Sequence, residues 1–277
     1  MTDRYAVIGH PIAHSKSPQI HAAFAAQTGQ DLVYEAILCE PEALKSRILE
    51  FRDQGGRGMN ITLPFKQEVM GLATEQSPAV RLAGAANTLI FSKTQIIAHN
   101  TDGLGLVRDL EVNLQFPLAG KSVLLLGAGG ASYGVVGPLL AAAVSALVVV
   151  NRTQDKARGL VDSFSHLSGS IALSTLPHGD LMESSRRFDV VINATSAGLS
   201  GQMLALPKNI FSPGALAYDM VYGRETIFMA FARAQAVQVA DGLGMLVEQA
   251  AEAFYLWRGL RPQSGPVINE LRRQEAG

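Results

Sequence analysis

Residues 122–150 contain no charged side chain, and this run constrains the fold more than any other part of the sequence. An apolar stretch of about 20 residues is long enough to span a bilayer. Here, however, glycines, serines and a proline interrupt the run, in the order strand, glycine turn, helix and strand. Parallel strands that are covered on both faces are equally free of charge. We therefore predict a buried strand–helix–strand unit and no membrane span.

A glycine-rich turn connects the first of these strands to the helix, with the sequence Leu-Gly-Ala-Gly-Gly-Ala-Ser over residues 126–132. Glycines allow a pyrophosphate to approach the backbone, and the N-terminus of the following helix supplies free N–H groups. An ordinary tight turn is the alternative, but the strand–turn–helix setting favours a dinucleotide site. The predicted cofactor-binding residues of this turn are Gly127, Ala128, Gly129, Gly130 and Ala131.

The end of the next strand indicates which dinucleotide is bound. Residues 146–150 lead into Asn151, Arg152 and Thr153, and Lys156 follows one helical turn later. An NAD site usually has an acidic residue here, which would repel the 2′-phosphate of NADP. This chain has no acid there, and the guanidinium of Arg152 suits a bidentate phosphate contact. Although an Arg at a helix start can simply be solvated, the turn and Arg152 together predict NADP.

Strands alternate with helices along most of the chain, which predicts an α/β fold. Its 277 residues are enough for two domains. We expect strands at residues 5–9, 32–38, 59–63, 88–91, 95–99, 123–126, 146–150, 190–193, 215–218 and 237–240. We expect helices at residues 17–28, 41–55, 103–112, 154–164, 226–234, 245–258 and 266–273.

Composition excludes several classes of partner. A formal net charge of −1 gives no electrostatic reason to expect nucleic acid or an anionic membrane, so we expect a small-molecule partner. The single cysteine, Cys39, cannot form an intrachain disulfide, and the N-terminus lacks a signal-peptide pattern, so we expect a cytoplasmic protein. His10, His14 and His21 match no usual metal-ligand spacing, and we expect no metal.

Small hydroxyl side chains precede the first predicted helix. Ser17-Pro18 is typical of a helix start, with Ser17 as N-cap and Pro18 at the first helical position. Ser15 is then a loop serine. The functional interpretation is that Ser15 and Ser17 bind a carboxylate or hydroxyls of a ligand near the helix N-terminus.

Further polar residues lie at the ends of the predicted strands in the first half of the chain. Asn60 and Thr62 alternate along a strand and therefore share a face, and Lys66 follows just beyond its end. A lone lysine is usually solvated, but Asn87 and Asp102 stand in loops at other strand ends. In open α/β sheets ligands bind at this edge.

Taken together, these segments resemble the shikimate dehydrogenase family along almost the whole chain. The resemblance rests on many spaced motifs in one order, namely the Ser15/Ser17 loop, residues 60–66, 83–88, 100–105, the glycine turn, residues 151–153, 193–198, 218–222 and 241–251. The resemblance implies reduction of 3-dehydroshikimate to shikimate with NADPH, a step of chorismate and aromatic amino acid biosynthesis.

The resemblance also implies a division of labour along the chain. It implies a substrate-binding domain of residues 1–102, onto which helices in 243–277 fold back, a Rossmann-type NADP-binding domain of residues 103–242, and a cleft between the two. By similarity, the catalytic residues are Lys66 and Asp102. The substrate would be held by Ser15, Ser17, Asn60, Thr62, Asn87, Asp102, Tyr222 and Gln249. NADP would be held by the glycine turn, Asn151, Arg152, Thr153 and Lys156, with Thr195, Met220, Gly242 and Met245 near it.

The chemistry agrees with this resemblance. Reducing a ketone needs a hydride on carbon, which NADPH supplies, and a proton on oxygen, which a positioned acid must supply. The ammonium of Lys66 can donate that proton, and Asp102 can orient it and accept hydrogen bonds from substrate hydroxyls. The chain departs from the family at Tyr133, where relatives often carry Arg, and at Ile227, where Pro is usual.

Two other functions stay open at the level of sequence. One is a dual-specificity quinate/shikimate dehydrogenase, although Ser15 and Ser17 favour shikimate. The other is an NADPH-binding regulatory protein without catalysis, against which the presence of both Lys66 and Asp102 argues. The sequence allows either a monomer or a homodimer.

Overall fold

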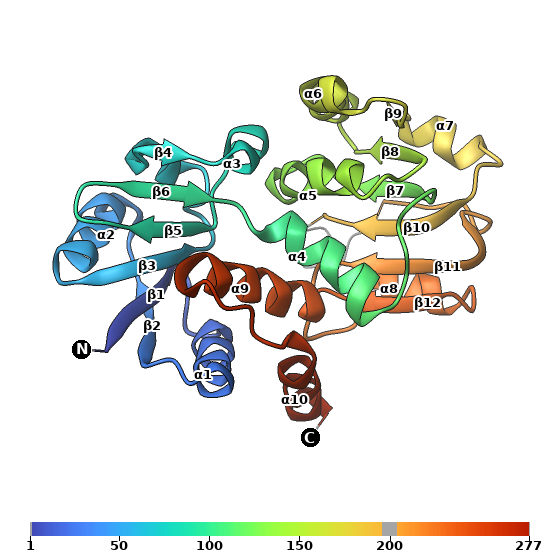
Figure 1. Cartoon of the computed structure of the whole chain (residues 1–277). Coiled ribbons are helices and arrows are strands. Elements are labelled where there is room, and N and C mark those ends of the chain that lie inside the picture. The colour runs from blue at the N-terminus through green and yellow to red at the C-terminus, as the bar shows by residue number, and fades with distance from the viewer. Residues whose placement is uncertain (1, 196–203, 277) are drawn as a thin grey trace. The chain divides into compact units, whose positions relative to one another are not determined.

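The computed structural model describes residues 2–195 and 204–276, which form two compact units. Unit 1 comprises Met1–Gly105 and Leu246–Gly277, and unit 2 comprises Leu106–Met245. The chain therefore leaves unit 1 within one helix and returns to it within another. Each unit has its own sheet (Figure 1). Each also has its own hydrophobic core.

Unit 1 is built on a mixed sheet. Among the described residues it has six strands in the order β2-β1-β3-β5-β6-β4. The pairs β1–β2, β1–β3 and β4–β6 are parallel, whereas β3–β5 and β5–β6 are antiparallel. The strands are β1 (Asp3–Gly9), β2 (Leu32–Leu38), β3 (Gly56–Ile61), β4 (Glu75–Gln76), β5 (Thr88–Phe91) and β6 (Ile96–His99). The helices are α1 (Ser17–Thr28), α2 (Leu44–Asp53), α3 (Pro78–Ala83) and α10 (Ser264–Ala276), with the short helical turns Pro41–Ala43 and Glu68–Leu72.

Two helices carry the chain across the division between the units. The first is α4 (Asp102–Arg108), and the second is α9 (Leu243–Arg258). The helix expected at residues 103–112 is wrong in one respect, because the backbone widens into a π-helical turn over Asp109–Asn113. In that turn the buried carboxylate of Asp109 accepts a hydrogen bond from the hydroxyl of Tyr218 (2.7 Å).

Unit 2 is built on a parallel sheet with the strand order β12-β11-β10-β7-β8-β9 among the described residues. The order reverses between β7 and β10, which makes this the topological switch point. The strands are β7 (Ser122–Leu126), β8 (Ala146–Val150), β9 (Ala172–Thr175), β10 (Phe188–Asn193), β11 (Phe211–Asp219) and β12 (Gln238–Asp241). The helices are α5 (Gly130–Ala141), α6 (Gln154–Phe164), α7 (His178–Glu183) and α8 (Ile227–Arg233), and Ser165–Leu167 forms a short helical turn.

The uncharged run of residues 122–150 forms β7, α5 and β8, as its pattern predicts. Leu124, Leu126, Val148 and Val150 are buried in one core cluster of unit 2, while Val123, Leu125, Leu147 and Val149 are buried on the other face. Burial on both faces explains why these strands lack the polar alternation of a half-exposed sheet. No described helix is long and apolar enough to cross a bilayer.

Candidate functional site

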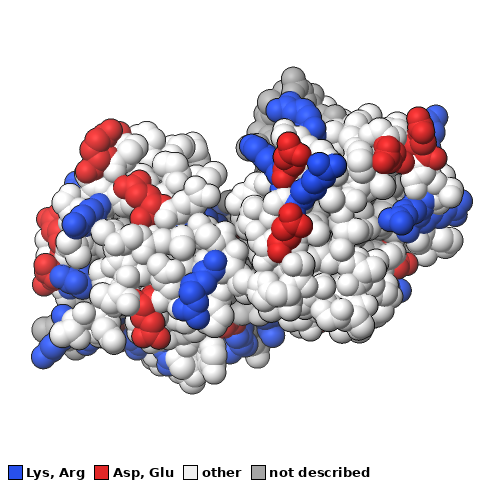
Figure 2. Space-filling model, turned by 90° about the horizontal axis from the view of Figure 1, so that it is seen from above, with Lys and Arg blue, Asp and Glu red and all other residues white. Residues whose placement is uncertain are grey.

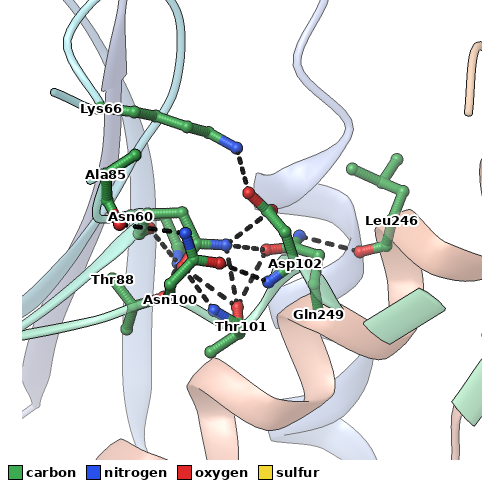
Figure 3. A network of polar contacts seen from close by, with 10 residues as sticks. Asn60, Lys66, Ala85, Thr88, Asn100, Thr101, Asp102, Leu246 and Gln249 are labelled. Atoms are coloured by element: carbon green, nitrogen blue, oxygen red, sulfur yellow. Dashed lines mark hydrogen bonds and ion pairs between the residues drawn. The ribbon is translucent and has the colours of Figure 1, made fainter. Parts of the chain in front are cut away.

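A lysine–carboxylate pair stands at the centre of a polar network in unit 1. Lys66 follows β3 and Asp102 begins α4, yet Lys66 Nζ lies 2.6 Å from Asp102 Oδ2. The lysine side chain is 29% exposed and the aspartate side chain 14%. Both groups are therefore reachable by a ligand while being partly shielded from water, which strengthens their attraction. Figure 3 shows Lys66 extending toward the carboxylate from the side opposite α9.

Asn87, which is buried, connects this pair to the rest of the network. Its side-chain amide nitrogen lies within hydrogen-bonding distance of Asp102 Oδ1 (2.8 Å), Thr101 Oγ1 (2.9 Å) and Gln249 Oε1 (3.2 Å). Its side-chain oxygen accepts the backbone N–H of Thr101 (2.9 Å). One oxygen of Asp102 is thus held by Asn87 while the other holds Lys66, so the carboxylate has a fixed orientation.

Asn60 belongs to the same network and is fixed by a residue that the sequence did not indicate. The hydroxyl of Tyr34, on β2, donates to Asn60 Oδ1 (2.7 Å), and Asn60 Nδ2 donates to Thr88 Oγ1 (3.0 Å). Burial raises the pKa of Tyr34 well above its ordinary value, although the side chain of Ser17 opposes this rise. A buried Asn on a strand needs hydrogen-bond partners, and this requirement was the only available signal for a polar residue nearby.

Two further residues of the network, Asn100 and Thr101, were not among the predicted site residues. Asn100 Nδ2 donates to the carbonyl of Ala85 (3.0 Å), and its side-chain oxygen accepts the N–H of Asp102 (3.1 Å). Asn100 therefore caps the start of α4 and holds the backbone of Asp102. Their position directly before Asp102 was the available signal, because polar residues that precede a helix commonly cap it.

The Ser15/Ser17 loop leads into α1, but the predicted cap is wrong. Ser17 is the first helical residue, Lys16 is the N-cap, and the N-cap side chain makes no capping hydrogen bond. Instead the hydroxyl of Ser15 accepts the N–H of Ser17 (3.3 Å), because the loop already turns at Ser15, whose N–H bonds the carbonyl of Ile12 (3.0 Å). Ser17 is buried and Ser15 half-buried.

Thr62 lies just beyond β3 rather than within it. The strand predicted over residues 59–63 ends at Ile61, because the N–H of Phe65 bonds the carbonyl of Thr62 (3.0 Å) and closes a turn. A Cβ added at Gly9 would lie 2.4 Å from the methyl carbon of Thr62, so only glycine fits beside it. Thr62 is half-buried.

The C-terminal part of the chain contributes Gln249 to the network of unit 1. Gln249 lies on α9, and its side-chain nitrogen donates to the carbonyl of Leu246 (2.8 Å). Its oxygen accepts a hydrogen bond from the side-chain nitrogen of Asn87 (3.2 Å). Tyr222 and Met245, which the resemblance placed near the ligands, belong to unit 2.

In unit 2 the glycine turn joins β7 to α5. Gly127 has φ +109°, a conformation that requires glycine, and its carbonyl accepts the hydroxyl of Ser132 (2.9 Å). The N–H of Tyr133 bonds the carbonyl of Gly129, so the N–H groups before Tyr133 have no partner within the helix. A Cβ added at Gly129 or Gly130 would have no atom within 4 Å. Ala128 and Ala131 complete the turn, and its backbone is open to a phosphate group.

The segment after β8 carries the predicted 2′-phosphate site. The side-chain nitrogen of Asn151 donates to the carbonyl of Thr153 (2.9 Å), which shapes the turn into α6. Arg152 and Lys156 are exposed, and no described carboxylate forms an ion pair with either. The open glycine turn and these two free cations together fit NADP.

Thr195, Met220 and Gly242 follow three neighbouring strands of the same sheet. Thr195 Oγ1 donates to Asn193 Oδ1 (2.7 Å), and the N–H of Met220 bonds the carbonyl of Asn193 (3.0 Å). A Cβ at Gly242 would lie 2.2 Å from the carbonyl oxygen of Met220, so glycine is required there. The end of the motif at residues 193–198, from residue 196 onward, lies outside the described residues.

The histidines of the N-terminal segment lie in different surroundings. His21 is buried, and its ring stacks on that of Tyr34 with centroids 4.1 Å apart. His10 Nδ1 lies 3.7 Å from Glu40 at the surface. Within residues 2–195 and 204–276, no group of three His, Cys, Asp or Glu side chains is placed to hold a metal ion.

Three family profiles match the chain. The shikimate dehydrogenase substrate-binding domain matches residues 7–89, the shikimate/quinate 5-dehydrogenase domain matches residues 111–200, and the shikimate 5′-dehydrogenase C-terminal domain matches residues 242–272. Together they cover most of the chain, and their order is that of the motifs above.

Whole proteins match over nearly the full length. A shikimate dehydrogenase (NADP+) of Dechloromonas aromatica is 54% identical over 98% of this chain and 98% of its own. The crystal structure of an Ael1 enzyme from Pseudomonas putida is 47% identical, with a TM-score of 0.92 over 98% of each chain. A Thermus thermophilus shikimate 5-dehydrogenase, solved with NADP(H) and shikimate, is 35% identical, with a TM-score of 0.85 over 98% of this chain and 99% of that one.

Proposed function

We propose that this chain, which belongs to the shikimate dehydrogenase family, catalyses the reversible NADP-dependent reduction of 3-dehydroshikimate to shikimate. The reaction is a step of aromatic amino acid biosynthesis. The observation that carries the proposal is the contact between Lys66 Nζ and Asp102 Oδ2 (2.6 Å) inside a network of amides and hydroxyls. Full-length relatives named NADP-dependent shikimate dehydrogenases support the choice of reaction.

We assign the substrate to unit 1. A polyhydroxylated ring acid needs several hydrogen-bonding groups that are already oriented, and unit 1 provides them. The side chains of Asn60, Asn87, Asp102 and Gln249 are each held by at least one other residue of the unit. Preorganised groups of this kind bind a ligand without losing much conformational entropy. Ser15, Ser17 and Thr62 complete the proposed set in unit 1, and Tyr222, which the resemblance also assigns to the substrate, belongs to unit 2.

We assign the proton transfer to Lys66. In the reduction, the ammonium gives a proton to the carbonyl oxygen while the carbonyl carbon accepts a hydride, which NADPH supplies when it is bound. The neutral amine then regains a proton from water. Asp102 holds Nζ in one place, since its own carboxylate is anchored by Asn87.

We assign the cofactor to unit 2. The helix N-terminus after the glycine turn attracts the pyrophosphate, and Arg152 and Lys156 attract the 2′-phosphate. Thr195, Met220, Gly242 and Met245 lie at or beyond the carboxyl ends of the strands past the switch point, where the nicotinamide half belongs.

We propose that the protein is a cytoplasmic enzyme with a small-molecule substrate and that it works as a monomer or a homodimer. Lys and Arg side chains alternate with Asp and Glu on the face drawn in Figure 2, in keeping with a net charge of −1. Such a surface offers little attraction to nucleic acid.

A four-way assay tests the proposed reaction. The purified chain is mixed with shikimate or quinate and with NADP or NAD, and absorbance at the nicotinamide band is followed. We expect the fastest reaction with shikimate and NADP. No absorbance change with this pair, in protein shown to be folded, would overturn the proposal and favour a regulatory NADPH-binding protein. Comparable rates with quinate would assign dual specificity instead.

A further inference from the structure

Three neighbouring strands of unit 2 end on polar side chains that are in register. Asn193 ends β10, Asp219 ends β11 and Asp241 ends β12, and the strand pairing sets Asn193 opposite Asp219 and Asp219 opposite Asp241. All three residues are buried. They lie at the carboxyl edge of the sheet, beside the switch point between β7 and β10, where a dinucleotide is bound in folds of this kind.

The carboxylate of Asp219 is fully buried and accepts hydrogen bonds from three donors. Its Oδ2 accepts from the side-chain amide of Asn193 (3.0 Å) and from the hydroxyl of Thr226 (2.5 Å). Its Oδ1 accepts from the backbone N–H of Val221 (3.0 Å). Burying a carboxylate is costly unless such donors surround it, so this arrangement holds the three donors in place as firmly as they hold the carboxylate.

Asp219 also fixes the orientation of the side-chain amide of Asn193. A carboxylate can only accept hydrogen bonds, so the nitrogen of Asn193 must point toward Asp219 and its oxygen must point away. That oxygen accepts both the N–H (3.2 Å) and the hydroxyl (2.7 Å) of Thr195. With the amide reversed, Thr195 would lose the acceptor for its N–H.

Thr195 in turn packs against the glycine turn. A Cβ added at Gly127 would lie 3.1 Å from the methyl carbon of Thr195, and the N–H of Ala194 bonds the carbonyl of Leu126 (2.9 Å). On the other side, the N–H of Met220 bonds the carbonyl of Asn193 (3.0 Å). The position of Asn193 therefore sets the positions of both Thr195 and Met220.

We propose that Asp219 is a positioning residue for the cofactor, acting through Asn193 on Thr195 and the adjoining glycine turn. Asp219 itself has no exposed surface and does not touch the cofactor. The inference rests on the proposed NADP binding by unit 2. Asp219 thus holds the cofactor-binding loops in the correct geometry before NADP binds.

The variant Asp219→Asn tests this proposal, because it keeps the shape of the side chain but sets one NH2 group against another. NADPH binding to the purified full chain is measured by isothermal titration calorimetry, without substrate. Losing one oriented hydrogen bond to the loop should raise the Kd for NADPH about tenfold. The KM for shikimate should stay unchanged, since unit 1 keeps its own network.

The exchanged pair Asn193→Asp with Asp219→Asn restores a donor facing an acceptor. The carboxylate introduced at position 193 would again accept from Thr195, and its other oxygen would accept from the amide introduced at position 219. We expect the double variant to recover most of the native Kd. Should Asp219→Asn fail to fold, Asn193→Ala cuts the same connection while leaving the bonds of Val221 and Thr226 to Asp219, and it should show the same rise in Kd.

Thr226→Val is the matched control. It removes a donor to Asp219 and the cap of α8, where Thr226 Oγ1 accepts the N–H of Met229 (3.2 Å), but it leaves Asn193 in place. It should lower thermal stability with little change in Kd. An unchanged Kd in Asp219→Asn, or an equal rise in Thr226→Val, would overturn the inference alone. A native chain that does not bind NADPH would overturn the proposed function as well.

Discussion

Arg152 is the residue to which we assign the choice between NADP and NAD. It is exposed, is separated from β8 by Asn151 alone, and has no described carboxylate partner to compete with a phosphate. Replacing it by Gln should raise the KM for NADP by about 10–100-fold, because a charge-assisted contact to the 2′-phosphate is lost. The KM for NAD, which lacks this phosphate, should hardly change.

Arg158→Gln is the control for this prediction. Arg158 is an exposed Arg of α6, the helix that follows Arg152, and it pairs with Asp155 (3.4 Å). Its loss should leave both KM values as they are. Equal effects on NADP and NAD in Arg152→Gln would contradict the assigned role.

At the residue scale, the polar residues of the site could be predicted from the sequence, but most of the hydrogen bonds between them could not. The segments that hold Lys66, Asn87 and Asp102 are recognisable along the chain, whereas their contacts join residues that are far apart in sequence. Tyr34 shows the limit, since a tyrosine on an edge strand has no local feature that links it to Asn60 on another strand. The start of α1 shows a second limit. Ser15 and Ser17 both offer a hydroxyl, and only the turn closed on the carbonyl of Ile12 makes Ser15 the one that accepts a backbone N–H.

At the scale of the elements, we expect the backbone geometry of the glycine turn to affect both stability and NADPH binding. Gly127→Ala should destabilise the protein by about 1–3 kcal/mol, since φ +109° is strained for any other residue. It should also weaken NADPH binding, because the new methyl group presses on Thr195. Urea unfolding and calorimetry measure the two effects.

Gly137→Ala is the control within α5. Its new Cβ would lie 3.5 Å from Phe164, an ordinary contact, and alanine favours the helix by up to about 1 kcal/mol. It should leave NADPH binding unchanged and stability equal or higher. If both variants weakened NADPH binding alike, the special role of Gly127 would be refuted.

Long, strongly patterned elements were predictable, and short ones were not. The buried strands β7, β8 and β10 and the helices α1 and α6 agree with expectation to within a few residues. The elements β4, α3, β9 and α7 were missed, each with six residues or fewer. For α3 a signal existed, because Ser77 caps it by accepting the N–H of Val80 (3.3 Å) just before Pro78. The π turn after α4 depends on the tertiary contact between Asp109 and Tyr218, which no local pattern contains.

At the scale of the whole molecule, the end of α9 stabilises unit 1 by contacts with its strands. The indole N–H of Trp257 donates to the carbonyl of Leu89 (2.9 Å), and its ring stacks on Tyr5 with centroids 4.6 Å apart. Arg258 pairs with Asp3, which lowers the pKa of that carboxyl. Gln249 of the same helix lies in the polar network, so folding of the tail and assembly of the site are coupled within this unit.

Acid stability of the whole chain should depend on His21. Burial lowers its pKa to about 3, an effect that the side chain of Asn60 opposes only in part. Because the folded pKa is below the unfolded value, the unfolded chain binds the proton first as the pH falls below about 6.5. Between pH 7.5 and pH 5 the native protein should lose about 2 kcal/mol of stability from this residue.

His21→Phe should remove that part of the loss, as measured by urea unfolding at the two pH values. His99, whose pKa is also lowered by burial, stays in the variant, so the dependence on pH should shrink without vanishing. His166→Gln, at an exposed site, is the control. A variant as sensitive to acid as the native protein would show that His21 is not buried as a neutral group.

Turnover of Lys66→Ala with shikimate and NADP, measured alongside its affinity for NADPH, tests the proposed chemistry at its centre. We expect kcat to fall by about 10²–10⁴-fold, because the group that takes the proton from the shikimate hydroxyl in this direction is gone, while calorimetry gives the native Kd for NADPH. Circular dichroism and thermal melting establish that the variant is folded. A folded variant that keeps kcat within a few-fold of the native value would refute the claim that Lys66, held by Asp102, transfers the proton.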